Sequence, residues 1–442
     1  MNFYTSEEQD AVRELSRQIF GDACTAERLP EIERDDSLGG MDDTLWQALA
    51  DAHLLGVDVS EDHGGSGYGF GAACVLLEEA GRALAPVPLL ASLVYAAPAI
   101  ERFGTEAQKE EWLSKVVSGE AVLSAALEEL GHADPARPLT RAKAQSEGWV
   151  LEGEKVCVPQ ANRAARILVP ATFEDGAVGV FLVDPGAPGV QLEAGVANNH
   201  ERQFLLNLQG AQVSKEDRLG EAADGAEVVQ WIVDRGQTAL AALQLGICES
   251  ALRKTAEYTS DRKQFGRPIG TFQAVSMRLA DAFIDLECMK STLWQAIWRL
   301  EEGLSASSEA AAAKWWACRG GSRVAHTAMH LHGGIGADID YPIHRHLLWA
   351  QQLGLTLGGA GQQLAQIGAN LAEGAKRAMQ ASSGEGSWAH FGQGRREPLG
   401  SRSGPVGPSI GPWAQGKEQA AEEEGLSLIH ISEPTRLGMI SY

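Results

Sequence analysis

The sequence has no apolar run near the roughly 20 residues that a membrane-spanning helix requires. Residues 1–5 also lack a basic stretch followed by an apolar core, the pattern of a secretory signal peptide. These two absences predict a protein without a membrane span, located in the cytoplasm.

Positive charge is scarce, with 37 lysines and arginines against 59 aspartates and glutamates and a formal net charge of −22. Nucleic-acid binding depends on basic side chains that displace counterions from phosphates, so this balance argues against a nucleic-acid partner. The six cysteines lack the close pairs of zinc or redox sites and the density of a secreted scaffold. We interpret them as small buried hydrophobes.

Histidines offer one weak metal-site pattern. His326 and His330 lie one helical turn apart, and His332 follows closely. No carboxylate completes the arrangement of a metalloprotease helix, so we expect no metal.

The 442 residues, 44% of them hydrophobic, suffice for two or three packed domains of an α+β protein. Residues 1–120 are predicted to form a helical domain that starts at a capping box of Ser6 and Gln9. The glycine-rich residues 63–69 interrupt the helical pattern. Because no lysine follows as in a P-loop, we interpret them as a flexible connection between helices rather than a phosphate cradle.

The periodicity changes over residues 121–225, where β-rich runs at 149–158 and 178–183 predict a β-domain. Helical spacing returns over residues 226–378. Within it, apolar side chains at steps of three and four residues predict one long buried helix: Phe272, Val275, Leu279, Phe283, Leu286, Leu293, Ile297 and Leu300. Residues 379–442 are rich in glycine, serine and proline and predict disorder; residues 426–436 also look like a translated sequencing adapter, so the tail has no part in the functional argument.

Residues 261–273 concentrate cations at a predicted corner between two helices. Gly266 ends one helix and Thr271 is placed to cap the next, with Arg262, Lys263 and Arg267 between the helices. Spacing alone leaves two interpretations open: a site for an anionic group, or a solvated basic turn in an acidic protein.

Two motifs carry a resemblance to a known family. The first is Arg-Lys-Gln-Phe-Gly at residues 262–266 with Gln273, and the second is His-Gly-Gly-Ile-Gly at 332–336 followed by Tyr341 and Pro342. With the element order, these motifs resemble acyl-CoA dehydrogenases over roughly residues 1–375. The resemblance implies an N-terminal helical domain, a middle β-barrel or sandwich domain and a C-terminal four-helix bundle.

The resemblance implies FAD as cofactor. In that family the two motifs bind the ADP half of an FAD that a neighbouring subunit mainly holds; a guanidinium forks onto the pyrophosphate, and glycines let the backbone approach. The matching positions in this sequence are Arg262, Phe265, Gln273, His330, Gly333, Gly334 and Gly336.

The usual catalytic base is missing. The family reaction removes the α-proton of a CoA thioester with a carboxylate while hydride leaves the β-carbon for the flavin. This sequence has Gly358 at the expected position of that carboxylate and Gly236 at an alternative position on the preceding helix. Asp234 and Asp340 are candidate substitutes. A shift of two helical residues, however, rotates a side chain by about 200°, and a base must lie within hydrogen-bond reach of its proton.

The middle domain also departs from the family pattern. Residues 127–134 differ from the family's Thr-Glu-Pro-x-x-Gly-Ser-Asp, and Cys157 and Pro159 stand where relatives have a tryptophan and a threonine that hold the flavin ring. Proline offers no side-chain donor. The segment that acts across a subunit interface is thus intact, whereas the chain's own flavin platform is not.

This asymmetry resembles bacterial heteromeric acyl-CoA dehydrogenases, α2β2 assemblies of which many act on steroid-CoA thioesters. It predicts a subunit that works on an acyl-CoA thioester with a second, base-bearing dehydrogenase-like subunit and passes electrons to electron-transfer flavoprotein. Two alternatives stay open. One is a catalytically silent CoA-ester-binding or scaffolding protein, and the other is a homotetrameric dehydrogenase with a non-standard base such as Asp234.

Overall fold

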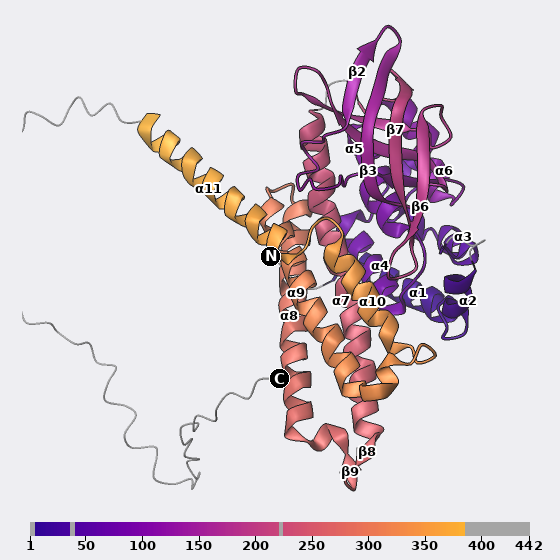
Figure 1. The fold of residues 1–442 in the computed structure, drawn as a ribbon, viewed down its shortest axis with the longest axis vertical. Coiled ribbons are helices and arrows are strands. Elements are labelled where there is room, and N and C mark those ends of the chain that lie inside the picture. The colour runs from indigo at the N-terminus through magenta and orange to yellow at the C-terminus, as the bar shows by residue number, and fades with distance from the viewer. Residues whose placement is uncertain (1–4, 36–39, 221–223, 385–442) are drawn as a thin grey trace, which may run out of the picture. The chain divides into compact units, whose positions relative to one another are not determined.

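The computed structural model describes residues 5–35, 40–220 and 224–384 (Figure 1). Its first region is helical, and Ser6 and Gln9 form the predicted capping box at the start of the first helix, with Ser6 Oγ accepting from the Gln9 N–H at 3.2 Å. The α-helices of this region are α1 (Glu7–Ala23), α2 (Arg28–Arg34), α3 (Asp43–Asp51), α4 (Gly69–Ala83), α5 (Ala97–Phe103) and α6 (Glu106–Val117). Shorter helical turns are η2 (Leu54–Gly56), η3 (Glu61–His63) and the π-helical η4 (Leu90–Ala96).

The glycine-rich segment connects η3 to α4, as the sequence predicts, but it is packed rather than loose. A Cβ on Gly65 would lie 2.0 Å from the Val59 carbonyl oxygen, so only glycine fits there. The backbone N–H groups of Ser66 and Gly67 donate to the Gly56 and Val59 carbonyls. The glycines therefore serve close packing.

The middle region is a seven-stranded sheet with the order β1-β4-β2-β3-β7-β6, in which β5 also pairs with β4. Its strands are β1 (Val122–Ala125), β2 (Arg141–Gln145), β3 (Gly148–Pro159), β4 (Ala164–Thr172), β5 (Val178–Val183), β6 (Val190–Val196) and β7 (Arg202–Ser214). β4 pairs in parallel with β1 and β2, and the other pairs are antiparallel. Alternate side chains of the strands form a core of their own around Leu151, Phe181 and Leu206.

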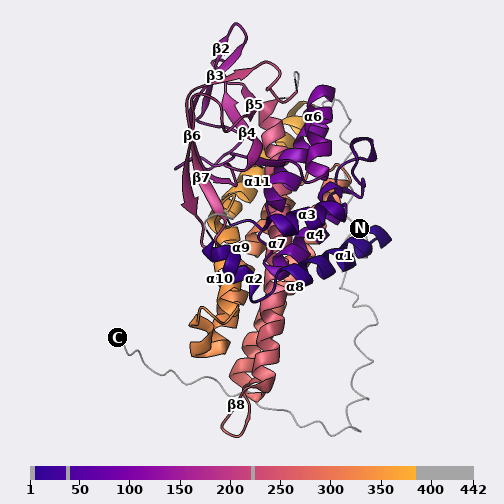
Figure 2. The same cartoon turned by 90° about the vertical axis from the view of Figure 1, so that its right-hand side faces the viewer.

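The third region is helical again, and the chain returns through a short hairpin. Its elements are α7 (Gly225–Asp261), β8 (Lys263–Gln264), β9 (Arg267–Pro268), η5 (Ile269–Thr271), α8 (Gln273–Glu301), α9 (Ser307–His332), η6 (Gly333–Ala337), α10 (Ile343–Leu355) and α11 (Ala360–Gly384). The sheet lies at the N-terminal end of α7 and the β8–β9 hairpin at its other end (Figures 1 and 2). One continuous core joins α7 to the helices of the first region.

Helix α8 is only partly buried, which corrects the prediction of one long buried helix. Leu286, Leu293 and Ile297, in its C-terminal half, are buried as predicted, but Phe283 is 54% exposed. Met277 and Ile284 in the same half of the helix as Phe283 are also mostly exposed. The apolar pattern of this half is therefore not explained by packing within the chain.

The changes of secondary structure fall near the predicted positions, since α6 ends at Val117, β1 begins at Val122 and α7 begins at Gly225. The division into three domains stays a prediction, because residues 1–380 form one compact unit. Helix α11 runs to Gly384, beyond the predicted end of the helical region at 378, and the rest of the predicted disordered tail lies outside the described residues. In the described part of the chain, no helix is long and apolar enough to cross a membrane.

Helices α4 and α7 approach each other through two glycines. A Cβ on Gly246 would lie 1.8 Å from the Glu78 carbonyl oxygen, and one on Gly81 would lie 2.1 Å from the Leu243 carbonyl oxygen. We expect Gly246→Ala to lower the free energy of unfolding by about 1–3 kcal/mol or more, because backbone must move to admit the methyl group. Urea unfolding measures this, with Gly368→Ala in α11 as control, since open space surrounds Gly368. Equal midpoints for Gly246→Ala and the unsubstituted chain would contradict the close packing.

Candidate functional site

The cationic segment forms a β-hairpin whose tip holds a strained residue. Lys263 pairs with Pro268 and Gln264 with Arg267, which leaves Phe265 and Gly266 as the two turn residues. Their φ angles are 52° and 78°. Two-residue turns of this type need positive φ at both positions. Glycine adopts that conformation freely, whereas a bulky phenylalanine does so at an energetic cost.

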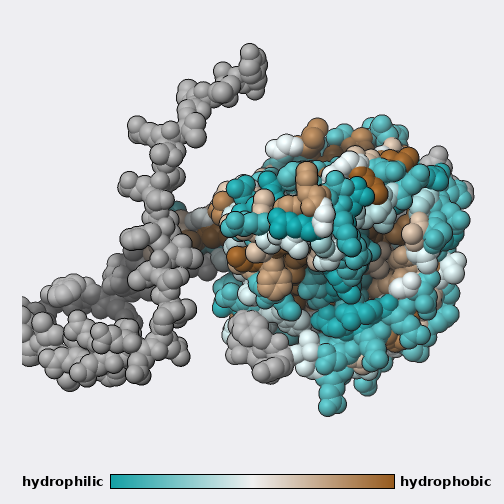
Figure 3. All heavy atoms as spheres, turned by 90° about the horizontal axis from the view of Figure 1, so that it is seen from below, coloured by the Kyte–Doolittle hydropathy of each residue, from teal (hydrophilic) through white to brown (hydrophobic). Residues whose placement is uncertain are grey.

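The hairpin presents apolar surface and positive charge to its surroundings. Phe265 is 92% exposed, and Arg262, Lys263 and Arg267 are exposed as well. Among the residues that the structure describes, none of these three cations lies within ion-pair distance of a carboxylate. Viewed from this end, the surface is mainly hydrophilic, with apolar side chains scattered over it (Figure 3).

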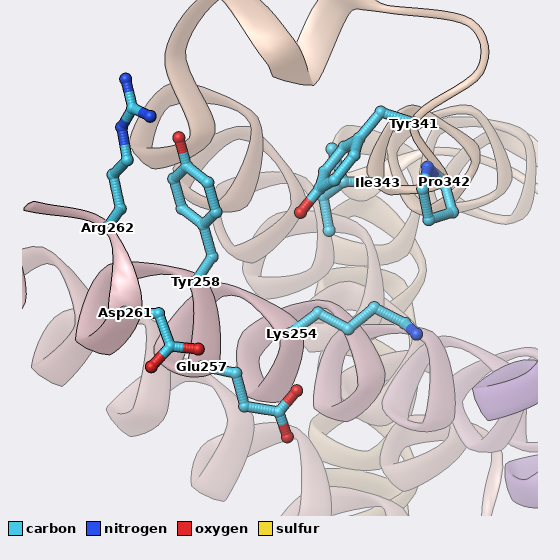
Figure 4. Close-up of a pocket in the computed structure, with 8 residues that line it drawn as sticks. All are labelled: Lys254, Glu257, Tyr258, Asp261, Arg262, Tyr341, Pro342 and Ile343. Atoms are coloured by element: carbon cyan, nitrogen blue, oxygen red, sulfur yellow. The ribbon is translucent and has the colours of Figure 1, made fainter.

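A cavity of about 460 Å³ opens beside Arg262. Its lining comes from the last turns of α7 and the start of α10: Lys254, Glu257, Tyr258, Asp261, Arg262, Tyr341, Pro342 and Ile343. The side chains of Arg262 and Tyr258 project from α7 to one side, and those of Glu257 and Asp261 project to the other (Figure 4). The cation is thus separated from the nearest carboxylates of its own helix.

Aromatic stacking joins the two predicted motifs at this corner. The ring of His332 stacks on Tyr258 with centroids 4.4 Å apart and lies 5.4 Å from the ring of Tyr341. His332 Nδ1 donates to the Ala328 carbonyl at 2.8 Å. Burial lowers the pKa of His332 and this hydrogen bond offsets part of the effect, so the ring is a neutral packing element.

The glycine turn after His332 leaves its surface open. Gly333 has φ 63° and ψ −141°, which only glycine adopts without strain. A Cβ on Gly333 or Gly334 would meet nothing, whereas one on Gly336 would meet the Met329 carbonyl at 3.0 Å. The first two glycines therefore let another molecule approach the backbone closely, and the third serves packing.

The remaining residues predicted to bind the cofactor are Gln273 and His330. Gln273 is the first residue of α8 and is exposed, and His330 is exposed in the last turn of α9. Tyr258 was not predicted, although its place four residues before Arg262 puts both side chains on one face of a helix. In the described ranges, no cluster of three histidine, cysteine or acidic side chains has a metal-binding arrangement.

The two expected base positions, Gly236 and Gly358, do not face each other in the structure. A Cβ on Gly236 would lie 2.9 Å from Leu357 Cδ1 and 2.6 Å from the ring of Tyr95. Gly358, in contrast, faces Gln362. The side chain that converges with Gly236 therefore belongs to Leu357, one residue before the predicted position. The Gly236 position is thus bordered by Leu357 and the Tyr95 ring, whereas the Gly358 position is bordered by the side-chain amides of Gln362 and Gln363.

The turn that carries Leu357 is held from several sides. Leu357 has φ 53°, and its N–H donates to Glu128 Oε1 at 3.0 Å. Gln363 Nε2 donates to the carbonyls of Leu357 and Gly358 at 2.8 and 3.1 Å. Burial raises the pKa of Glu128, and the Leu357 N–H and Lys314 offset part of that effect. Glu128 therefore has a structural role, because it holds the Leu357 turn. The sequence showed only that its segment, residues 127–134, differs from the family pattern.

The candidate substitute bases lie elsewhere. Asp234 accepts from Gln230 at 2.7 Å and from Ser307 at 2.6 Å, so its carboxylate ties α7 to the start of α9. Burial raises the pKa of Asp234 to about 6, although these two hydrogen bonds lower it. Asp340 precedes α10 and Leu357 follows it, and the 13 residues of that helix separate the two by roughly 20 Å.

The two positions predicted to hold the flavin ring in relatives, Cys157 and Pro159 in this chain, lie in β3, and their effect on a flavin stays a prediction. Cys157 is exposed at a bulge in β3 with φ 54°, and Pro159 ends the strand. Between α4, η4, α7 and α10 the enclosed cavity measures only about 60 Å³, and its walls include Leu77, Leu243 and Leu353. Ligand pockets measure about 300–1,000 Å³, so this space is smaller than a typical ligand pocket. Its lining includes neither Gly236 nor Leu357.

Comparisons with known proteins agree with this geometry. Residues 6–120 match the family model for the N-terminal domain of acyl-CoA dehydrogenases, and residues 223–372 match the model for the C-terminal domain. The chain is 39% identical over 382 residues to the acyl-CoA dehydrogenase FadE27 of Mycobacterium tuberculosis, covering 84% of this chain and 99% of that protein.

Solved structures give the same picture. The ChsE4-ChsE5 complex from Mycobacterium tuberculosis contains a chain that is 38% identical, with a TM-score of 0.79, covering 84% of this chain and 99% of that one. A variant of the Tcur3481-Tcur3483 steroid ACAD matches with 47% identity, a TM-score of 0.78 and the same coverage. Butyryl-CoA dehydrogenase from Megasphaera elsdenii matches at 28% identity, with a TM-score of 0.76, 84% coverage of this chain and 100% of that one.

Proposed function

The chain belongs to the acyl-CoA dehydrogenase family, whose members are FAD-dependent oxidoreductases, and from this premise we propose that it is the base-lacking subunit of a heteromeric acyl-CoA dehydrogenase. Its role is to complete the FAD site of a base-bearing partner. The residues that would hold the ADP half are Arg262, Phe265, Gln273, His330, Gly333, Gly334 and Gly336.

The exposed hairpin carries this proposal. A phenylalanine held at positive φ and 92% exposed gains nothing from its own chain beyond an edge-to-face contact with Phe272. Backbone strain of this kind persists at sites that bind something. Arg262 can fork onto phosphate oxygens, and the open glycines at 333 and 334 admit the cofactor to the backbone. These residues fit the diphosphate and adenosine of a dinucleotide.

The residues at the expected base positions support a division of labour. Leu357 and Tyr95 lie against Gly236 at the alternative base position, and neither offers a carboxylate. FAD, when bound, supplies the hydride acceptor for α,β-desaturation. The proton must then be removed by a carboxylate of the partner, while this chain orients the cofactor and excludes water from its ADP half.

The relatives support a proposal for the partner and the substrate. Two similar structures are named as two-component proteins, and one of them is named a steroid ACAD, so we infer a second dehydrogenase-like subunit and a steroid-type CoA thioester. The exposed apolar side chains of α8, Met277, Phe283 and Ile284, provide a surface for that subunit. Electron-transfer flavoprotein is the proposed electron acceptor.

Co-expression tests the proposal against its two alternatives. We expect this chain alone to be colourless and inert toward acyl-CoAs, and to form a yellow, active complex only with a base-bearing homologue. Flavin absorbance, size-exclusion chromatography and dehydrogenation assays report each property. Activity of the chain alone would establish the homotetrameric alternative. If the base-bearing homologue is active and binds flavin with the same affinity with and without this chain, the scaffolding alternative would be established.

A further inference from the structure

A buried lysine and a cysteine contact each other on α9, outside the cofactor corner. Lys314 and Cys318 are four residues apart and therefore share one face of the helix. Lys314 Nζ lies 3.3 Å from Cys318 Sγ. Lys314 is 0% exposed and Cys318 is 9% exposed, so both residues are buried and Cys318 alone keeps a small accessible area.

The pair holds the C-terminal end of α10. Lys314 Nζ donates to the Leu353 carbonyl at 2.6 Å, and Cys318 Sγ donates to the Gly354 carbonyl at 3.1 Å. A cation is favourable at a helix C-terminus, where carbonyl groups lack partners within the helix. The Leu357 turn follows directly, so both side chains contribute to fixing it.

We propose that Lys314 and Cys318 are a modification site, at which hydrogen peroxide joins them through a sulfur–nitrogen bond. In the first step the Cys318 thiolate takes one oxygen from the peroxide, which gives a sulfenic acid and water. In the second step the amine nitrogen of Lys314 attacks this sulfur. The S–N bond forms, the S–O bond breaks, and the hydroxyl leaves as a second water with a proton from the amine. Sulfur is oxidised by two electrons and the peroxide is reduced.

The local environment suits both steps. Peroxide oxidises a cysteine in its thiolate form, and Lys314 Nζ, 3.3 Å from Cys318 Sγ, is placed to take the thiol proton. Burial lowers the pKa of Lys314, and Cys318 and Glu128 offset part of that effect, so the neutral amine is more accessible than in a solvated lysine. A sulfenic acid is known to condense with a nearby nitrogen, and no other nitrogen nucleophile among the described side chains is recorded at this sulfur.

The other cysteines lack this combination. Burial raises the pKa of the Cys248 thiol to about 12, and Cys248 contacts an amide, Gln244, rather than an amine. Cys157 is exposed, but burial of part of the side chain and the charges of Glu128 and Glu201 raise its pKa. The cross-link is therefore specific to Cys318.

Closing the bond would change how α10 is held. The bonded nitrogen carries no positive charge, so the Leu353 carbonyl loses its ammonium donor and Glu128 loses a nearby cation. The Leu357 turn, which depends on Glu128, would then be held less firmly. The site thus responds to oxidant at the point where α10 meets the β-region.

Peptide mapping of the peroxide-treated full chain tests the proposal. Trypsin cleaves after lysine, and Trp315 follows Lys314, so the native chain yields separate peptides ending at Lys314 and at Arg319. After peroxide, blocking of free thiols, denaturation and digestion, we expect loss of cleavage at Lys314. The joined peptide should be lighter by two hydrogens than the same uncleaved peptide without the bond. Treatment with a thiol reductant after the peroxide and before digestion should restore cleavage.

Two variants make the test specific. Cys318→Ser keeps a hydroxyl in place of the thiol and should retain full cleavage at Lys314 after peroxide, whereas Cys157→Ser should still form the cross-link. Cleavage at Lys314 in a treated chain whose Cys318 carries added oxygen would overturn the proposal. If Cys318→Ser fails to fold, Cys318→Ala provides the same comparison, and the mass of the unsubstituted chain decides the matter by itself.

Discussion

Arg262→Ala should weaken FAD binding by the complex by about 10- to 150-fold. A hydrogen-bonded charge pair contributes about 1.5–3 kcal/mol, and each 1.4 kcal/mol corresponds to a factor of ten. Arg262 is exposed beside an open cavity and makes no ion pair among the described residues, so its removal should leave the fold intact. Flavin titration of the purified complex measures the loss.

The control for this variant is Arg253→Ala. Arg253 is an exposed arginine of the same helix, and its removal changes the net charge equally. It should leave flavin affinity unchanged. Arg262→Lys should fall between the two, because lysine keeps the charge but lacks the planar fork. Unchanged flavin affinity of an Arg262→Ala complex that stays assembled by size-exclusion chromatography would refute the proposed role of this chain.

The sequence correctly predicts a corner between two helices near residue 262, but its capping residues are wrong. Helix α7 ends at Asp261, Gly266 lies in the hairpin turn, and Thr271 Oγ1 donates to the Pro268 carbonyl at 2.7 Å instead of capping α8. The conformation of Phe265 could not be read in the same way, because positive φ is unusual for phenylalanine and propensity predicts against it. The proposed binding role gives a reason for a phenylalanine at that angle.

The base position shows the limit of counting along a motif. The expected position, Gly358, follows from aligning a short glycine-rich turn, and such turns tolerate a shift of one residue. In the structure the side chain of Leu357, the preceding residue, meets Gly236, which lies on another helix, and the assignment of the base position to Gly358 stays a prediction. The meeting of residues that are far apart in the sequence depends on tertiary packing, which no local pattern contains.

The exposed half of α8 shows a different limit. Periodicity correctly indicates an apolar face from Phe272 to Leu300, but it cannot tell whether that face packs within the chain or against another molecule. Burial of Leu293 and exposure of Phe283 separate the two halves. The whole pattern predicts one buried helix; its second half is buried, whereas its first half is better explained as a contact surface.

A buried ion pair in the β-region should produce the largest stability effect. Lys155 Nζ lies 2.8 Å from Glu129 Oε1, with the two side chains 0% and 4% exposed. Glu129 also accepts from the backbone N–H of Leu139 and from the N–H and hydroxyl of Thr140. One carboxylate therefore connects β3 to the loop that precedes β2.

We expect Glu129→Met to cost about 3–5 kcal/mol, because it leaves a buried ammonium group and two backbone donors without their partner. Lys155→Met should cost less, about 1–3 kcal/mol, because Glu129 keeps its three other donors. Urea unfolding of both variants measures the difference. Equal costs would mean that the ion pair, rather than the hydrogen bonds to the loop, accounts for the stabilisation.

The same carboxylate gives a pH dependence with a definite sign. Burial alone would raise the pKa of Glu129, but Lys155 and the hydrogen bonds from Thr140 and Leu139 outweigh it and hold the pKa below its ordinary value of 4.5. A lowered folded-state pKa means that the unfolded chain binds the proton more tightly. The stability that Glu129 contributes is therefore present above about pH 4.5 and is lost as the pH falls through its folded-state pKa. The difference in unfolding free energy between the unsubstituted chain and Glu129→Met should shrink over that acidic range, and a difference that is constant across it would place the stabilisation elsewhere.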